Sequence, residues 1–327
     1  MKKFVDSLKP ELTLQRFPLP TFSALRIRSL MLCLLITLLS KTWSKAEPPQ
    51  PTVIPYYSRV QNIVYKKHGK QPLRLDAYIP KSEGPFPAVL VVHGGAWMSG
   101  SKSQLSGYAM MLVRRGIACF AINYRLAPKY KHPAQIEDCR DAVRWIKTQG
   151  KHYQVDSSRI GAIGYSAGGH LVTMLAVTGM TRDEDPMGVG TQIQVALAGG
   201  APCDLRHYQD LGFWLGDRQS RIPDVYRSAS PITHVTSEDA PVFFYHGAQD
   251  RLVPVKGVLA MYELLQKTQI DSSLNIIPRA GHIGAVFAPK ALESAFLFLQ
   301  KHLDKQKPAY LDPGDYRNFG TTRPLEN

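Results

Sequence analysis

The sequence predicts an α/β fold, with a mostly parallel central sheet, helices on both faces and a small cap excursion. The runs 88–92 (AVLVV) and 117–123 (IACFAIN) are continuously apolar, which is typical of strands buried on both faces of a sheet. Such runs alternate along the chain with segments of helical periodicity, as in parallel α/β proteins. The 327 residues, 44% hydrophobic and 20% charged, can bury a sizeable core and exclude a disordered, collagen-like or coiled-coil chain.

The expected elements follow one another in a regular order. Segments 59–66 and 73–79 are predicted to pair as antiparallel strands at an edge of the sheet. The other predicted strands are 88–92, 117–123, 159–164, 193–198, 242–245 and 274–277. The predicted helices are 104–115, 134–149, 167–178, 255–268 and 289–302. The clearest of them carries its apolar residues on one face: Ile136, Cys139, Val143 and Ile146.

The chain is expected to hold one folded domain between two different ends. No linker or internal repeat divides residues 59–303, which we assign to the α/β domain. A proline-rich lead-in, 47–58, precedes this domain, and a polar, irregular tail, 304–327, follows it. Within the domain, residues 202–239 mix aromatic, charged and turn residues, so they are predicted to form a short excursion over the sheet.

The N-terminal segment 1–46 predicts export. Its eight Lys and Arg residues and two acidic residues contribute +6 of the total net charge of +14. The apolar run 30–39 (LMLCLLITLL) is shorter than the roughly 20 residues of a transmembrane helix. A basic flank, a short apolar core and the small residues Ser44 and Ala46 are typical of a secretory signal peptide. We therefore predict a periplasmic or secreted protein without a membrane span in the mature chain, or a membrane-anchored protein if the segment stays uncleaved.

The remaining composition favours neither a nucleic-acid partner nor a metal site. Residues 47–327 carry a net charge of +8, which is usual for a solvated surface of this size. Cys33 lies in the signal core, which leaves Cys119, Cys139 and Cys203. These three include no CxxC pair or His/Cys cluster, so neither a disulfide framework nor zinc is expected, although one internal disulfide stays open.

Gly164-Tyr165-Ser166-Ala167-Gly168 matches the pattern G-x-S-x-G. The motif ends an apolar strand and opens a predicted helix, so Ser166 is expected on a tight strand-to-helix turn that exposes its hydroxyl. Glycines suit such a turn because the backbone is crowded there. The alternative is a Ser/Gly-rich turn without chemistry. In this context we interpret Ser166 as a nucleophile.

A serine nucleophile needs a base and an acid that orients the base. In folds with this strand-to-helix turn, the three residues follow in the order Ser, Asp or Glu, His, each after a strand. Asp250 follows the predicted strand 242–245, and His282 follows 274–277. Taken singly, each could be an ordinary loop residue. Together with Ser166 they predict a catalytic triad.

The predicted chemistry also needs donors for an oxyanion. The loop Gly94-Gly95-Ala96 follows strand 88–92, where backbone N–H groups can complete such a hole with the N–H of Ala167. Donation is assigned to Gly95, Ala96 and Ala167. His93 is interpreted as a residue that orders this loop through a hydrogen bond and takes no proton in the reaction.

A phosphate-binding loop is the competing interpretation of the same segment. Gly95 and Gly100 have P-loop spacing, and Lys102 follows. The inserted Ser101 breaks the required G-K-[ST] and displaces the lysine. Nucleotide binding is therefore not expected.

The blocks HGGAWMSGSK, INYRLAP, IGYSAGGHL, HGAQDRLVP and AGH resemble those of the α/β-hydrolase superfamily. They are most similar to esterases related to hormone-sensitive lipase and to bacterial feruloyl and acetyl xylan esterases. The resemblance covers roughly residues 60–302. It implies an α/β-hydrolase fold and a carboxylic ester hydrolase that works through an acyl-enzyme without a cofactor. By position it assigns the nucleophile to Ser166, the acid to Asp250, the base to His282 and the oxyanion loop to 94–96.

The chain departs from that pattern at two positions. Ala96 stands where many relatives carry a third glycine; its N–H can still donate, but its methyl group narrows the acyl pocket. Tyr165 stands where the lipase-like branch often has aspartate, which favours the polysaccharide-esterase branch. A large N-terminal helical cap has no counterpart here, so a more open site is expected.

The sequence thus predicts a serine esterase for a small-molecule or polysaccharide-borne ester. Acetyl, feruloyl and other short-chain esters all fit, and Trp97, Tyr165 and Trp214 are candidate substrate-binding residues. For each tryptophan taken singly, core packing is the preferred interpretation. Hydrolysis of an aryl formamide or a peptide by the same triad is the second functional candidate. A non-catalytic binding protein is disfavoured because all three triad residues are present.

Overall fold

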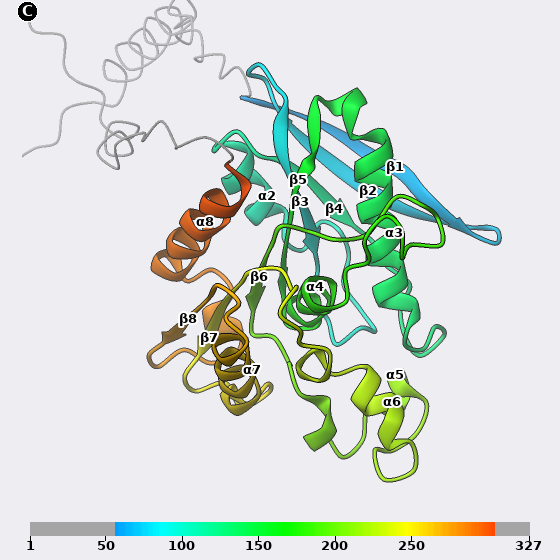
Figure 1. The fold of residues 1–327 in the computed structure, drawn as a ribbon, viewed down its shortest axis with the longest axis vertical. Coiled ribbons are helices and arrows are strands. Elements are labelled where there is room, and N and C mark those ends of the chain that lie inside the picture. Colours follow the sequence, from blue (N-terminus) through cyan, green and yellow to red (C-terminus); the bar gives the residue numbers. More distant parts are fainter. Residues whose placement is uncertain (1–55, 305–327) are drawn as a thin grey trace, which may run out of the picture. The chain divides into compact units, whose positions relative to one another are not determined.

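The central sheet has eight strands in the order β1-β2-β4-β3-β5-β6-β7-β8 (Figure 1). The protein is described here by a computed structural model, which covers residues 56–304. The strands are β1 (Tyr57–His68), β2 (Gln71–Pro80), β3 (Phe86–Val92), β4 (Ala118–Ile122), β5 (Val155–Tyr165), β6 (Val195–Gly199), β7 (Val242–Gly247) and β8 (Ser272–Ile277). Strand β2 pairs antiparallel with β1 and β4, and all other pairs are parallel. The predicted mostly parallel sheet with an antiparallel edge pair is therefore confirmed.

Helices cover both faces of this sheet. They are α2 (Ser106–Val113), α3 (Ala134–Gln149), α4 (Ala167–Val177), α5 (Gly212–Leu215), α6 (Pro223–Ser228), α7 (Val255–Lys267) and α8 (Pro289–Leu303). Helices α3, α4 and α7 contribute to one buried apolar cluster, and α2 and α8 contribute to a second. Alternate residues of one strand enter the two clusters: Leu90 and Val92 of β3 face the first, and Val89 and Val91 face the second. This alternation explains why the buried strands carry unbroken apolar runs.

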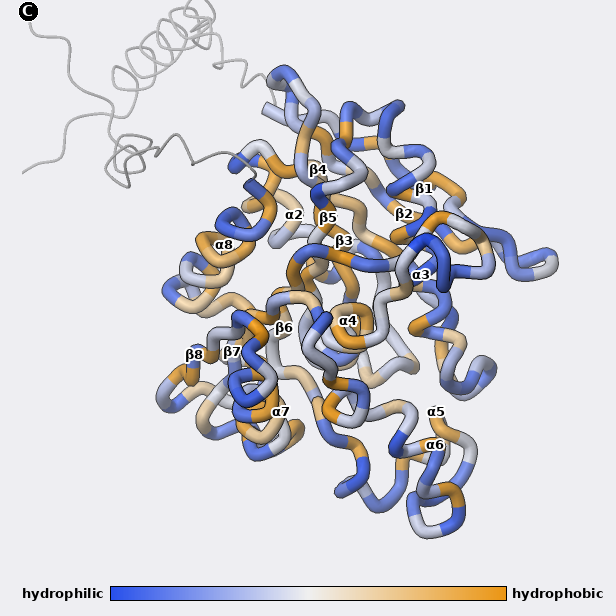
Figure 2. The backbone as a smooth tube through the Cα atoms, in the orientation of Figure 1, coloured by the Kyte–Doolittle hydropathy of each residue, from blue (hydrophilic) through white to orange (hydrophobic). Residues whose placement is uncertain are grey.

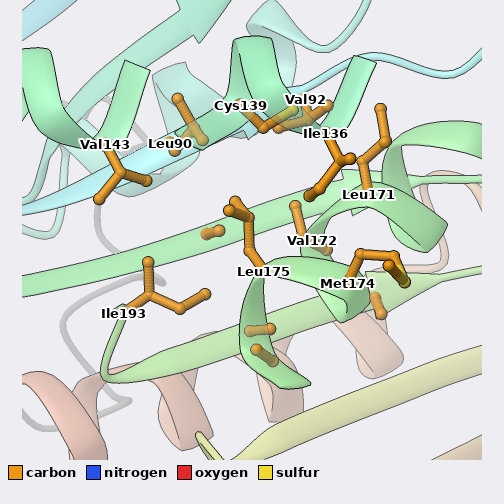
Figure 3. Packing of buried hydrophobic residues seen from close by; sticks show 14 of the residues in the cluster. Leu90, Val92, Ile136, Cys139, Val143, Leu171, Val172, Met174, Leu175 and Ile193 are labelled. Atoms are coloured by element: carbon orange, nitrogen blue, oxygen red, sulfur yellow. The ribbon is translucent and has the colours of Figure 1, made fainter. Parts of the chain in front are cut away.

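Figure 3 shows the larger cluster, in which side chains of α3 and α4 pack against β3. The face of α3 predicted from its periodicity is the buried one, and the helix has the predicted bounds. Apolar segments gather in the central strands and in helices such as α4, whereas many of the peripheral loops are hydrophilic (Figure 2). Among residues 56–304, no helix is both long and apolar enough to span a membrane.

Several element boundaries differ from the sequence predictions. Strand β1 begins at Tyr57, inside the predicted lead-in 47–58, because its backbone already pairs with Pro80 of β2. Helix α2 is shorter than the predicted 104–115. The excursion at 202–239 holds α5, α6 and short 3-10 turns, as expected of a small cap. The predicted signal segment 1–46 lies outside the described residues, as do most of the lead-in and the tail 305–327.

The connectivity reverses direction beside β5. The chain leaves β3 through α2 to reach β4 on one side, and it leaves β5 through α4 to reach β6 on the other. Ligand sites of open α/β sheets lie at such a switch point, outside the carboxyl ends of the strands. The loops after β3, β5, β7 and β8 meet at this edge, and they carry the residues singled out from the sequence.

The contact between α4 and β3 permits a test of the fold. A Cβ atom on Gly168 would lie 2.0 Å from the Val92 carbonyl oxygen, whereas one on Gly257 of α7 would meet nothing closer than 3.7 Å. Gly168→Ala should therefore lower the free energy of unfolding by more than about 3 kcal/mol, because backbone cannot move aside as a side chain can. Gly257→Ala is the matched control, and it should raise stability by about 0.5–1 kcal/mol because helical glycine is entropically costly. Urea denaturation measures both, and equal midpoints for the two variants would contradict the packing described.

Candidate active site

Ser166 occupies the turn between β5 and α4 in a backbone conformation that side-chain-bearing residues rarely adopt. Its φ is 56° and its ψ is −121°. The Ser166 N–H donates to the Gly199 carbonyl at 2.8 Å, which ties the turn to the end of β6. A Cβ atom on Gly164 would lie 2.3 Å from the Gly168 carbonyl oxygen, so the turn closes on itself too tightly for any side chain. The glycines predicted from the motif are therefore required by the backbone.

The three residues of the predicted triad come together in one hydrogen-bonded chain. Ser166 Oγ lies 2.9 Å from His282 Nε2, and His282 Nδ1 lies 2.6 Å from Asp250 Oδ2. Because a carboxylate only accepts, His282 carries its proton on Nδ1, and Nε2 is left to accept the serine hydroxyl. These hydrogen-bonded side chains can therefore remove a proton from the Ser166 hydroxyl.

Asp250 is held by its own turn. Its side chain is fully buried, and Oδ1 accepts hydrogen bonds from the N–H groups of Leu252 at 3.0 Å and Val253 at 2.8 Å. These bonds use one carboxylate oxygen and leave the other facing His282. The loop after β7 thereby fixes the orientation of the carboxyl group.

Tyrosine hydroxyls hold the loop that carries His282. Tyr165 donates to the backbone carbonyl of His282, and Tyr108 donates to that of Val286. Tyr108 also shares a 2.9 Å hydrogen bond with Tyr245, and burial raises the pKa of all three hydroxyls. Tyr165, predicted to bind substrate, lines the pocket, but its hydroxyl is engaged by the loop of His282.

The loop after β3 crosses in front of Ser166. Gly95, Ala96 and Trp97 have φ values of 101°, 50° and 59°. A Cβ atom on Gly94 would lie 2.9 Å from the Tyr165 carbonyl oxygen, so this loop packs directly on the strand that leads to Ser166. Within the described part of the chain, the N–H groups of Gly95 and Ala96 donate to no protein acceptor. The N–H of Ala167, the first residue of α4, has no acceptor within its helix either.

Trp97 anchors this loop in the core. Its ring stacks on Trp214 at 3.7 Å between centroids, and its indole N–H lies 3.3 Å from His170 Nδ1. Trp214 is fully buried and donates to Gln135, and Trp97 is 5% exposed. Neither ring lines the pocket in front of Ser166, so core packing, the interpretation preferred from the sequence, accounts for both rings in this structure.

His93 supports the same loop from the other side. Its ring stacks on Tyr124 at 4.2 Å, and its Nδ1 lies 2.8 Å from the Gly94 carbonyl. Burial lowers the pKa of His93 to about 4, so the ring is neutral near pH 7. This geometry agrees with the interpretation of His93 as a residue that orders the loop.

A pocket of about 540 Å³ opens in front of Ser166 and His282. Sequence reasoning missed its apolar rim, in which the exposed fractions are 47% for Met98, 67% for Leu252, 79% for Ile283 and 52% for Phe287. Large exposed apolar side chains gathered at one place are typical of a ligand-binding surface. Their position could have indicated this rim from the sequence, since all four residues lie in the same loops as the predicted site residues.

The structure also places Lys102 and the three cysteines of the domain. The ammonium of Lys102, weighed as part of a phosphate-binding loop, lies 2.8 Å from the buried carboxylate of Asp76 and is thus paired with strand β2. Cys119, Cys139 and Cys203 are buried free thiols, so the disulfide that the sequence left open is not present. Over residues 56–304, no group of three or more His, Cys, Asp or Glu side chains could hold a metal ion.

Comparison with known proteins agrees with this arrangement. The sequence profile of the BD-FAE family matches residues 75–265, more than half of the chain. The chain belongs to the BD-FAE family. This match confirms the resemblance to α/β-hydrolase esterases, and it spans Ser166 and Asp250 as well as the loop 94–96.

Curated relatives of this BD-FAE protein include two esterases of Mycobacterium tuberculosis. Esterase LipC is 31% identical over 67% of this chain and 59% of its own length, and the probable carboxylic ester hydrolase LipM is 32% identical over 56% and 46%. The chain therefore spans about half the length of these relatives. Among solved structures, esterase 2 of Thermogutta terrifontis superposes with a TM-score of 0.66 at 25% identity, covering 78% of this chain and 96% of that one. A carbohydrate esterase from gut microbiota superposes with a TM-score of 0.68 at 22% identity, covering 76% and 97%, which supports the fold.

The buried histidines of the site predict a loss of stability in mild acid. Burial lowers the pKa of His170 to about 3 and that of His93 to about 4, against about 6.5 in an unfolded chain. Between pH 6.5 and 5 the unfolded state therefore binds protons that the folded state does not. The free energy of unfolding should fall as the pH falls, with each histidine contributing up to about 1.4 kcal/mol per pH unit.

Urea denaturation at pH 6.5, 6.0, 5.5 and 5.0 measures this slope. His170→Gln removes one of the groups with a lowered pKa and should make the slope shallower. His152→Gln, on the exposed surface, is the control for the substitution itself. A slope that His170→Gln leaves unchanged would show that this ring does not carry the effect.

Proposed function

We propose that this protein is a carboxylic ester hydrolase with Ser166 as nucleophile, His282 as general base and Asp250 as the acid that orients it. The observation that carries the proposal is the hydrogen-bonded chain of these three side chains, with distances of 2.9 Å and 2.6 Å, next to backbone N–H groups without acceptors. The relatives named as esterases support the same reaction class.

The geometry suits acyl transfer in two steps. Ser166 Oγ attacks the ester carbonyl carbon while its proton moves to His282 Nε2, and Asp250 stabilises the imidazolium that forms. The carbonyl oxygen becomes an oxyanion, for which the N–H groups of Gly95, Ala96 and Ala167 are the donors. His282 then gives its proton to the departing alkoxide. In the second step a water molecule, deprotonated by His282, attacks the acyl-enzyme and releases the carboxylic acid and free Ser166.

The two sides of the site suit the two parts of an ester. The pocket in front of Ser166 has the apolar rim described above, and a second pocket of about 480 Å³ shares Leu252 with it. The lining of the second pocket is mostly apolar as well, and the side chains of Asp204, His207, Tyr208 and Lys256 also reach it. We propose short-chain and carbohydrate-linked esters, such as acetyl or feruloyl esters, as the substrate class, because the two adjoining pockets offer separate space for an acyl group and an alcohol. Export of the protein stays a prediction from residues 1–46.

Amide hydrolysis by the same triad is the second candidate function. A relative named kynurenine formamidase, from Meyerozyma guilliermondii, is 25% identical over 67% of this chain and 84% of its own length. The same proton transfers would serve an amide and an ester. The one difference is that an amine must be protonated before it can leave. A panel of nitrophenyl esters, methyl ferulate, acetylated xylan, an aryl formamide and a peptide separates the two candidates.

Ser166→Ala should reduce kcat for p-nitrophenyl acetate by a factor on the order of 10⁴–10⁶, because the covalent step is lost. Asp250→Asn should reduce it by about 10⁴, because His282 would then adopt the wrong tautomer. Ser294→Ala, at an exposed position on α8, is the control and should keep wild-type kcat. Wild-type turnover in the Ser166 variant would contradict the mechanism.

Phe287 should set the size of the acyl group that the site accepts. Its ring lines the pocket and contacts Tyr108 edge to face at 5.3 Å, so it occupies space beside the loop 94–96. Phe287→Ala should raise kcat/KM for nitrophenyl hexanoate relative to acetate by about tenfold, because the space left by the ring would bury about two more CH₂ groups of the longer acyl chain, at about 0.8 kcal/mol each. Leu297→Ala, exposed on α8, is the control. An unchanged chain-length profile would place the acyl group elsewhere.

A further inference from the structure

His246 lies at the carboxyl end of β7, fully buried behind Asp250. Its Nε2 atom lies 2.8 Å from the Val253 carbonyl oxygen and 3.2 Å from Asp250 Oδ2. Both neighbours are acceptors, so Nε2 carries the ring proton. In the described part of the chain, Nδ1 has no hydrogen-bond partner. A buried nitrogen without a hydrogen-bond partner costs free energy, so a histidine at this position needs an explanation. The polar contacts that can supply one are those of Nε2.

The contacts of His246 and Asp250 converge on one residue. The N–H of Val253 donates to Asp250 Oδ1 at 2.8 Å, and the carbonyl of the same residue accepts from His246. His246 therefore holds Val253, whose N–H fixes Asp250 Oδ1, and its Nε2 also lies against Asp250 Oδ2. A rotation of the carboxyl group away from His282 would have to break this arrangement.

The charge state of His246 suits this place. Burial lowers the pKa of its imidazole, although Asp250 acts in the opposite direction, and the ring is neutral near pH 7. A neutral N–H can orient the carboxylate without bringing a second positive charge beside it. A lysine or arginine in this position would compete with the His282 imidazolium for Asp250 at the moment when that imidazolium forms.

We propose that His246 is a positioning residue of the Ser166–His282–Asp250 triad: its Nε2–H holds Val253 and Asp250 Oδ2 so that the carboxylate stays aligned with His282 Nδ1. This inference rests on the proposed function, because it concerns the same triad. It assigns a role to a side chain that does not contact the substrate.

The test compares substitutions that do and do not place a donor at the Nε2 position. In His246→Gln the side-chain amide reaches that position, whereas in His246→Asn the amide ends at the position of Nδ1, and His246→Leu has no donor. We expect the Asn and Leu variants to lose between about 10- and 100-fold in kcat with KM within about twofold, because a small misplacement of a catalytic group has this effect. The Gln variant should stay within about threefold of the wild type.

The Gln and Asn variants keep the test valid if the Leu variant does not fold, and thermal unfolding identifies that case. His234 supplies the matched control, because its Nε2 also lies 2.8 Å from a backbone carbonyl, that of Ser228, in the excursion 202–239. His234→Gln and His234→Asn should have the same kcat. If the Gln and Asn variants of His246 have equal kcat, the donor at Nε2 has no positioning role and the inference is overturned.

The rate at which a fluorophosphonate probe labels Ser166 separates this inference from the proposed function. Labelling depends on the triad and not on the identity of the ester. A wild-type protein that is labelled but hydrolyses no ester would contradict the proposed substrate class. Equal labelling rates in the Gln and Asn variants would contradict the role of His246.

Discussion

The close approach of backbone to backbone around Ser166 is the constraint on which the rest of the site depends. The first turn of α4 meets the carbonyl of Val92 at Gly168, and Gly164 faces the carbonyl of Gly168 with no room for a Cβ atom. These contacts hold Ser166 at a positive φ and raise its hydroxyl above the carboxyl edge of the sheet. The energy that this conformation costs is offset by the packing of α4, whose residues are all buried.

The other parts of the site are brought to Ser166 by side chains that play no direct part in the chemistry. The loop after β3 is held by the ring of Trp97 in the core and by His93 next to it. The loop after β8 is held by the hydroxyl groups of Tyr165 and Tyr108. Buried aromatic residues with one polar atom suit this task, because they contribute apolar packing and a directed hydrogen bond together. The precision of the site therefore comes from the core beneath it.

Most of the fold could be predicted because each element carries a local signal. Periodicity was sufficient for α3, and unbroken apolar runs were sufficient for β3 and β4. Ser166, Asp250 and His282 could be singled out from their positions after strands, since carboxyl ends of parallel strands share one edge. Core packing of Trp97 and Trp214 was the preferred interpretation but could not be separated from a substrate contact, because an aromatic residue in a loop has the same local pattern whether it packs inward or faces a substrate. The apolar rim and His246 escaped for the same reason, since their neighbours come from distant segments.

The sequence by itself determined the alternation of strands and helices, the glycines of the Ser166 turn and the order Ser, Asp, His. These properties are local, because they depend on residue type, spacing and backbone freedom. Only the tertiary structure decided which side chains support the site and which surround its pocket. That outcome depends on contacts between residues far apart in the chain: Trp97 with Trp214, Tyr165 with the carbonyl of His282, and Leu252 between the two pockets. Such contacts exist only once the sheet has brought the loops together.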